Sequence, residues 1–308
     1  PPAYTTNGAV WPNYDLVWHL EQSAFPYLDS TRNDPALDGD APVQTQGIVG
    51  NGQQFNGSST YLDAGVVNLN NAFTLSAWVD IPFGAYSCQG IWANQQGGYG
   101  SAGLALFVNK YQTTNGAVLL DAGDGGSGSE ISTTTNLITP GRWHLVTAAI
   151  NRAASSAAFY VDGNPEPIVS GSAIVADFAN NADLNFGRFT NSALYLEGAM
   201  DEARIYGGIE DSNWVWASWA TVASNSLLQS YSAIMRSAPS LSVGVAGAIA
   251  NFVWPATGVG YALFTATNLT PPVSWSPAGV QPLLTNNQWQ ISLPYGNTGS
   301  RFYRLQSQ

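Results

Sequence analysis

The sequence predicts an all-β protein with two successive domains. Its 308 residues include 32 glycines and 17 prolines, and Ser, Thr and Asn separate short apolar runs, a composition that favours strands joined by turns. Several runs alternate with a period of two. In residues 73–79, FTLSAWV, the odd-numbered apolar residues form one face and Thr74, Ser76 and Trp78 form the other. The strand pattern stops near residue 225 and starts again at Leu241, which indicates a second core.

This pattern divides the chain into four segments. We expect an extended N-terminal segment at residues 1–14 and a large β-rich domain at residues 15–225. A linker at residues 226–238 should lead to a small β-rich domain at residues 239–308. About 70 residues are near the lower end for an independent core.

One short helix is expected at the end of the large domain. Asp211 or Ser212 is a suitable N-cap for the run NWVWASWATVA that follows. Trp216, Trp219 and Ala220 recur at helical spacing, so we expect the tryptophans to pack this helix onto the sandwich.

The charge balance excludes several kinds of partner. The net charge is −11 and Lys110 is the only lysine, so no basic patch is available for nucleic acid or anionic lipid. No apolar run approaches the roughly 20 residues needed to span a bilayer, so membrane insertion is not expected. The single cysteine, Cys88, cannot form an intrachain disulfide and is expected to be a buried, inert thiol.

The opening residues and the surface composition indicate export. The chain starts with PPAYTTNGAV, without a methionine or a charged leader, as a processed chain would. A surface poor in lysine and rich in Asn, Ser, Thr and Gly is consistent with this interpretation. We therefore expect a secreted or cell-surface location.

Six motifs in order carry a resemblance to a known family. They are VWHLEQSAFPYLDSTRND, FNGSSTYLDAG, FTLSAWV, GRWHLVTAAI, FYVDGNP and LYLEGAMDEARIY, the last followed by the expected helix. Over about 200 residues they resemble the laminin-G-like jelly roll of the concanavalin A-like lectin and glucanase superfamily, in its bacterial extracellular form. The resemblance implies a jelly-roll sandwich for the large domain.

The last 70 residues resemble a different module. From VWPATGVGYALFTATNL to RFYRL they are similar to the small immunoglobulin- or fibronectin-III-like sandwich appended to secreted proteins of planctomycete- and verrucomicrobia-type bacteria. This likeness implies an exported, multi-domain surface protein and suggests no chemistry.

The carboxylates near the end of the large domain do not form a glycosidase pair. Glu197 and Asp201 would lie about 13 Å apart on an extended strand, whereas a retaining pair needs about 5.5 Å. Asp201 and Glu202 point to opposite faces unless a bulge intervenes. The related glucanases carry an E-x-D-x-x-E pattern that is missing here. His19 and His144 lie in no Ser–His–Asp or HExxH setting, so we expect structural roles for them and no enzyme.

The resemblance also implies a possible structural calcium ion. Asp201, just before ARIY, corresponds to an Asp that holds Ca²⁺ in several members of the superfamily, together with backbone carbonyls of the N-terminal strand. Calcium takes six to eight oxygen ligands, so Glu21 or Asp29 would be needed as well. The alternative is that Asp201 accepts hydrogen bonds from nearby backbone amides.

A loop-rich stretch supplies candidates for a glycan site. Sugar rings stack on exposed aromatic faces, with amides and carboxylates beside them. Trp92 is expected in the core, whereas Tyr86 and Tyr99, flanked by Gly and Ser, are expected to be exposed, with Asn94 nearby. Asp124 lies in GDGGSG, residues 123–128, which no helix follows and which is therefore a hairpin loop rather than a dinucleotide-binding loop.

Together these features favour a non-catalytic extracellular protein that binds a glycan or a surface protein. A second hypothesis is a subunit of an extracellular filament or surface layer, because the apolar N-terminal PPAYTTNGAVWP would suit strand exchange between subunits. A third is a glycoside hydrolase of the same superfamily.

Overall fold

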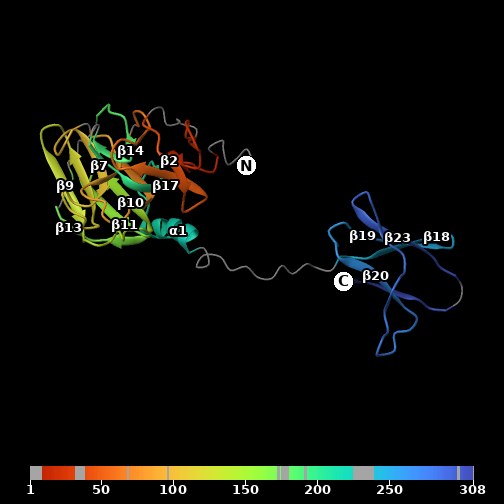
Figure 1. Cartoon of the computed structure of the whole chain (residues 1–308). Coiled ribbons are helices and arrows are strands. Elements are labelled where there is room, and N and C mark those ends of the chain that lie inside the picture. The colour runs from red at the N-terminus through yellow and green to blue at the C-terminus, as the bar shows by residue number, and fades with distance from the viewer. Residues whose placement is uncertain are drawn as a thin grey trace. The chain divides into compact units, whose positions relative to one another are not determined.

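The computed structural model divides into two compact units, residues 1–230 and 231–308 (Figure 1). Nearly all described elements are strands, which confirms the all-β prediction. The predicted linker, residues 226–238, lies outside the described residues, as do residues 1–8 of the N-terminal segment. The structure describes residues 9–31, 39–67, 69–95, 97–171, 174, 180–190, 193–224, 239–296 and 299–307.

Among the described residues of the larger unit, most strands belong to an eight-stranded and a seven-stranded sheet. The first consists of β1 (Tyr14–Trp18), β2 (Val43–Gln46), β3 (Asn51–Asn56), β5 (Ala72–Asp80), β10 (Trp143–Asn151), β11 (Ser156–Val161), β12 (Asn164–Glu166) and β17 (Glu197–Tyr206). The second consists of β4 (Leu62–Asp63), β6 (Gln89–Ala93), β7 (Gly103–Val108), β8 (Val118–Gly123), β9 (Gly128–Thr133), β13 (Ile168–Ser170) and β14 (Asn185–Phe186). The remaining elements are the hairpin β15 (Arg188–Thr190) and β16 (Ala193–Tyr195) and the helix α1 (Ser212–Ala223).

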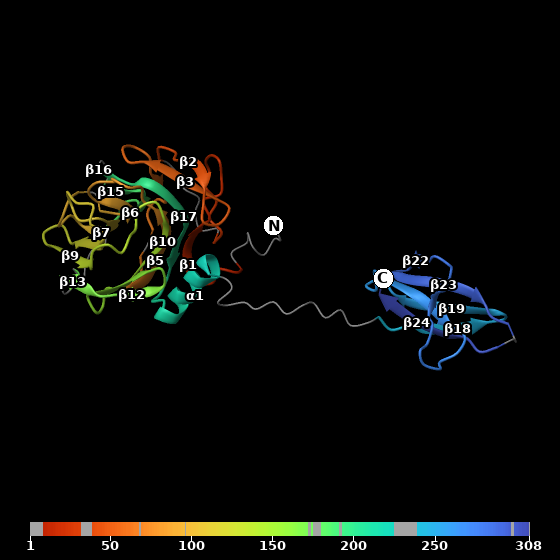
Figure 2. The ribbon, with the colours of Figure 1, turned by 60° about the horizontal axis from the view of Figure 1, so that its bottom comes forward.

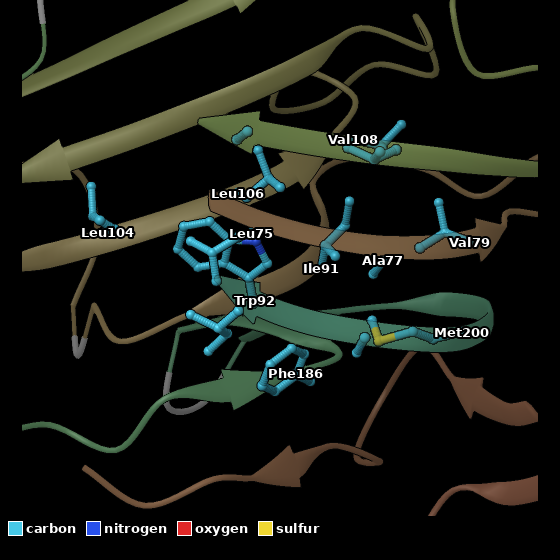
Figure 3. Close-up of a cluster of buried hydrophobic side chains, with 14 of the residues drawn as sticks. Leu75, Ala77, Val79, Ile91, Trp92, Leu104, Leu106, Val108, Phe186 and Met200 are labelled. Atoms are coloured by element: carbon cyan, nitrogen blue, oxygen red, sulfur yellow. The ribbon is translucent and has the colours of Figure 1, made fainter. Parts of the chain in front are cut away.

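The main core lies between these two sheets. On β5, Leu75, Ala77 and Val79 face the core with Phe73, so the predicted alternation is confirmed (Figure 3). Trp92 of β6 is fully buried in the same cluster, as expected. Alternate residues of β7 and β8 complete the cluster from the other sheet.

The strand order places β17 at the centre of the eight-stranded sheet. The order is β12-β11-β10-β5-β17-β3-β2, and β1 also pairs with β17. The register of β17 against β5 shifts between Asp201 and Arg204, and Glu202 has a φ of 51°. The shift is a β-bulge. Because a bulge interrupts the alternation of side chains, Asp201 and Glu202 need not point to opposite faces of the sheet.

The helix α1 covers part of the outer face of the eight-stranded sheet and lies beside β12 (Figure 2). Asp211 is its N-cap and accepts a hydrogen bond from the Trp214 amide, as predicted. Val215, not the tryptophans, is buried against Ala149 and Tyr160 of the sheet.

The prediction that the helix tryptophans serve as packing residues is therefore wrong for two of them. Trp214 is 55% exposed and Trp216 is 38% exposed. The buried residues of α1 are Val215 and Ala220, so Ala220 of the expected stripe is buried whereas Trp216 is not.

His144 has the expected structural role. Its Nε2 accepts a hydrogen bond from the Thr139 amide at 3.0 Å, which leaves the proton on Nδ1 to be donated to Asp162 Oδ2 at 2.8 Å. Asp162 and Gly163 form the turn between β11 and β12.

The single cysteine and the hydropathy of the helical segments were two features of the sequence composition. Cys88 is buried, and burial raises the pKa of its thiol to about 11, as expected for an inert cysteine. None of the described helical segments is long and apolar enough to cross a membrane.

The smaller unit consists of two antiparallel sheets with a small core. Four strands are ordered β18 (Ser242–Ala246), β19 (Ile249–Pro255), β23 (Gln288–Pro294), β22 (Leu283–Thr285). Three are ordered β21 (Ser276–Pro277), β20 (Tyr261–Ala266), β24 (Phe302–Ser307). The buried cluster contains Phe252, Trp254, Leu263 and Ile291, together with Ala250.

Candidate functional site

A groove of about 560 Å³ lies between the N-terminal segment and the helix α1. Its volume is in the range of small-ligand sites. We call it the aromatic groove, and the residues that define it are Trp11, Tyr14, Arg204, Tyr206, Glu210 and Trp214.

The strands β1 and β17 and the helix α1 bring these residues together. Tyr14 opens β1 and pairs with Tyr206 at the end of β17, with their ring centroids 5.2 Å apart. Arg204 lies two residues before Tyr206, so both side chains emerge on the same face of the strand. The chain then passes through Glu210 into the first turn of α1, which presents Trp214.

Glu210 holds two aromatic side chains in place. Its Oε1 accepts hydrogen bonds from Tyr14 Oη at 2.7 Å and from Trp214 Nε1 at 2.9 Å. Burial raises the pKa of Glu210 and, together with the charge of Glu210, raises the pKa of Tyr14 to about 12. The two rings are thus oriented before any ligand arrives.

Arg204 supplies positive charge next to these rings. Its Cζ lies 5.2 Å from the ring centroid of Trp11, a cation–π distance, and its guanidinium is paired with Glu202. Glu202 Oε1 also lies 2.7 Å from Nδ1 of His19, and this hydrogen bond raises the pKa of His19. Burial alone would raise the pKa of Glu202, but His19 and Arg204 outweigh it and the pKa is lowered.

The arrangement is suited to recognising a sugar. Trp214 is 55% exposed and held in one orientation, so a pyranose ring can stack on it, while Arg204 can donate hydrogen bonds to hydroxyl or carboxylate oxygens. The sequence interpretation missed this site because Trp11 and Trp214 are about 200 residues apart and Trp214 was assigned to packing. A signal was available in Val215, an apolar residue of the helix that lies outside the expected stripe.

The predicted glycan residues are not brought together at one place. Tyr86 is 59% exposed and Tyr99 is 65% exposed, as expected, but they flank opposite ends of β6. The strand between the two loops has five residues and is about 16 Å long.

Tyr99 and Asp124 lie in neighbouring loops. The Gly125 amide donates to the carbonyl of Gly100 at 3.0 Å, and Tyr99 Oη donates to the carbonyl of Gly128 at 2.7 Å. Asp124 is at the tip of the β8–β9 hairpin, as the hairpin prediction required. Its Oδ1 accepts from two backbone amides of that turn.

Asn94 is oriented toward the protein interior. It is 7% exposed, and its Oδ1 accepts a hydrogen bond from the Leu104 amide at 2.8 Å. Among the four predicted glycan residues, the structure therefore places Tyr99 and Asp124 in neighbouring loops, Tyr86 beyond the other end of β6, and Asn94 in the interior.

Asp201 is fully buried beneath the loop that follows β2. Its Oδ2 accepts a hydrogen bond from the Val49 amide at 3.0 Å, and its Oδ1 accepts one from the Glu202 amide at 2.8 Å. A β-carbon at Gly47 would collide with Oδ2, so only glycine lets this loop approach. Burial raises the pKa of Asp201 to about 7.

The other two predicted calcium ligands are placed differently. Asp29 Oδ1 accepts hydrogen bonds from the amides of Val17 and Thr31, both at 2.9 Å, and Glu21 is exposed. Within the described part of the chain, no three His, Cys, Asp or Glu side chains form a group that could hold a metal ion. Both oxygens of Asp201 face amide hydrogens, which do not fit a cation. This arrangement matches the amide-bonded alternative, and calcium binding stays a prediction.

One pair of carboxylates faces each other across two strands. Asp121 of β8 is directly opposite Glu130 of β9, so both side chains lie on the same face of the seven-stranded sheet. Burial, followed by the charge of Glu130, raises the pKa of Asp121 to about 7. Asp121 is only 2% exposed, however, and a catalytic acid must reach its substrate. A pattern search along single strands could not detect this pair.

The comparison with protein families settles the family of the larger unit. A model described as the concanavalin A-like lectin/glucanases superfamily matches residues 56–215. The chain belongs to this superfamily. The match covers the strands from β4 to β17, the Asp121–Glu130 pair, Asp201 and the beginning of α1.

Solved structures show the same fold at low sequence identity. The binding domain of Paraclostridial Mosquitocidal Protein 1 is 14% identical with a TM-score of 0.53, covering 92% of this chain and 67% of that one. Trypanosoma rangeli sialidase is 17% identical with a TM-score of 0.51, covering 68% and 33%. The receptor binding domain of botulinum neurotoxin D is 12% identical with a TM-score of 0.50, covering 68% and 52%. The chain thus spans only a third of the sialidase, and a search of curated proteins gave no match.

Proposed function

We propose that this chain is a non-catalytic extracellular binding protein that recognises carbohydrate in the aromatic groove. The observation that carries the proposal is the exposed ring of Trp214, held by Glu210 beside the guanidinium of Arg204 in a groove of about 560 Å³. An exposed tryptophan with a fixed orientation costs little ordering entropy when a sugar stacks on it.

The comparisons support a binding role at the level of fold. The superfamily includes lectins by name, and two of the similar structures are described as binding or receptor binding domains. The function of a fold lies in its site, so the groove and not the likeness determines the ligand class. An extracellular location is part of the same proposal, because soluble glycans and surface glycans are met outside the cell.

A glycan array with the full chain should identify a ligand, and calorimetry with that ligand should test the groove. Trp214→Ala should weaken binding about tenfold, because loss of a stacking ring costs on the order of 1 kcal/mol. Trp216→Ala is the matched control: it removes an exposed tryptophan of the same helix that does not line the groove, and affinity should be unchanged.

Two results would contradict the proposal. One is the absence of any bound glycan for the wild-type chain. The other is an equal loss of affinity in Trp214→Ala and Trp216→Ala, which would show that the helix and not the groove matters.

The hydrolase hypothesis is tested on the same ligands. Incubation of the chain with each bound glycan should release no reducing ends. Release that Asp121→Asn abolishes would replace the binding proposal with a glycosidase that uses the Asp121–Glu130 pair.

A further inference from the structure

The strand order of the smaller unit corresponds to an incomplete immunoglobulin-type sandwich. A constant-type immunoglobulin domain has strands A, B, E and D in one sheet and C, F and G in the other. The four-stranded sheet, in the spatial order β18-β19-β23-β22, corresponds to A-B-E-D. In the three-stranded sheet, β20 corresponds to C and β24 to F. The short β21 pairs with the opposite edge of β20. Within the described residues, no strand pairs with the outer edge of β24, which is position G.

A groove lies where that strand is missing. It has a volume of about 980 Å³ and lies between β18 and β24, the neighbours of position G. We call it the strand groove; its main apolar lining residues are Val243, Val245, Phe252, Leu293, Tyr303 and Leu305.

The strand groove has exposed apolar side chains on one side and backbone groups without a strand partner on the other. Val243 and Val245 are 61% and 59% exposed, although they lie two residues apart on the groove-facing side of β18. The outer edge of β24 has a row of backbone donors and acceptors without a strand partner in the described fold. One added strand would cover the valines and pair with this edge.

We propose that the strand groove accepts, as this added strand, residues 1–8 of a second copy of the chain. This interaction is independent of the carbohydrate-binding proposal. The recognition mode is β-strand addition, in which main-chain hydrogen bonds give affinity and alternate side chains fill pockets.

The chemistry of the N-terminal segment fits this groove. The first charged side chain in the sequence is that of Asp15, so residues 1–8 can be desolvated without burying a charged side chain. Tyr4, Thr5 and Thr6 favour extended structure. Prolines occur at positions 1 and 2, and the six residues 3–8 that complete the segment match the five to seven residues of β18, β19, β23 and β24.

The donor segment also has a fixed anchor. Trp11 and Tyr14 pack against each other in the larger unit, with ring centroids 5.4 Å apart, and residues 1–8 precede this pair in the sequence. Donor and acceptor therefore belong to different compact units. Each copy offers one donor and one acceptor, a heterologous arrangement that generates open chains of subunits if it does not close into a ring.

Three variants of the full chain test the proposal by mass photometry and sedimentation over a wide concentration range. Val243→Asp puts a charge into the strand groove, and removal of residues 1–8 deletes the donor; each should weaken self-association at least tenfold. Leu283→Asp is the matched control, because Leu283 is 69% exposed on β22, the opposite edge of the same sheet, and does not line the groove. This control should associate like the wild type.

Mixing separates insertion between copies from insertion within one copy. The Val243→Asp chain keeps its donor, and the chain without residues 1–8 keeps its groove, so an equimolar mixture should form a dimer that neither forms alone. A wild-type chain that stays monomeric, unchanged association without residues 1–8, or a mixture that stays monomeric would each overturn the proposal.

Discussion

The buried carboxyl of Asp201 should make the larger unit less stable as the pH rises through neutrality. Burial raises its pKa from 3.8 to about 7 in the folded chain. Between these two values the folded state holds more protons than the unfolded state, so the free energy of unfolding decreases with rising pH. The cost of ionising Asp201 is absent below the unfolded pKa and complete above the folded one.

The magnitude follows from the pKa difference. The shift from 3.8 to about 7 is about 3 units, and at 1.36 kcal/mol per unit the expected loss is about 4 kcal/mol. That is a large part of the 5 to 15 kcal/mol that typically separates folded from unfolded domains. The pKa of Asp121 is raised to the same value, so ionisation of Asp121 acts in the same direction. His19, whose pKa is raised by Glu202, also loses its stabilising contribution as the pH rises.

Melting temperatures measured from about pH 5 to about pH 8 in a chelator should show this decrease. Asp201→Asn removes one titrating group, so its curve should be flatter than that of the wild type. It should also start lower, because the amide nitrogen of Asn cannot accept a hydrogen bond and leaves a backbone donor without a partner, at about 1 to 3 kcal/mol. A wild-type curve that is level or rises over this interval, or an equal slope in Asp201→Asn, would refute the reasoning.

Added calcium distinguishes the two alternatives for Asp201, which are calcium ligation and hydrogen bonding to backbone amides. If Asp201 ligates calcium, the ion stabilises the charged carboxylate, and saturating calcium should raise the melting temperature of the wild type above neutral pH but not that of Asp201→Asn. Asp121→Asn is the matched control and should keep the calcium response. Melting curves that are the same with calcium and with chelator would contradict calcium binding and support the alternative in which Asp201 only accepts hydrogen bonds from backbone amides.

Three further predictions concern the core, the loops and the domain boundary. Trp92→Ala should lower the free energy of unfolding by roughly 3 to 5 kcal/mol in denaturant titrations, because its side chain is fully buried. The Tyr86→Ala, Tyr99→Ala double variant should keep its glycan affinity if the aromatic groove is the site, and a loss of about tenfold would move the site to these loops. Limited proteolysis should cut first between residues 225 and 240 and release two folded fragments, whereas protection throughout that segment would contradict two separate cores.

The sequence allowed the fold to be predicted where one periodic pattern decided the matter. The alternation in β5 identified the core face, and Asp211 located the start of α1. Such features depend on residues that are neighbours in the chain. The bulge at Glu202 could not be predicted, since it breaks the period of two in β17 and is stabilised by contacts with His19 and Arg204.

The candidate sites were harder to predict because they are assembled from distant segments. Trp11 and Trp214 meet only when β1 pairs with β17, and Asp121 meets Glu130 only in the register of one hairpin. Reasoning from spacing along the chain uses only neighbouring residues. It therefore predicted that Tyr99 is exposed, but not that Trp214 lines a groove with Trp11 and Arg204.

The exposed valines of β18 and the open edge of β24 have a consequence for ionic strength. Any two copies that meet at this edge each carry a net charge of −11, and their mutual repulsion opposes the encounter. Dissolved salt shortens the range of that repulsion to about 10 Å at 0.1 M, while the apolar contact itself is not weakened. The proposed contact between copies should therefore be weak in dilute buffer and strengthen as salt is added.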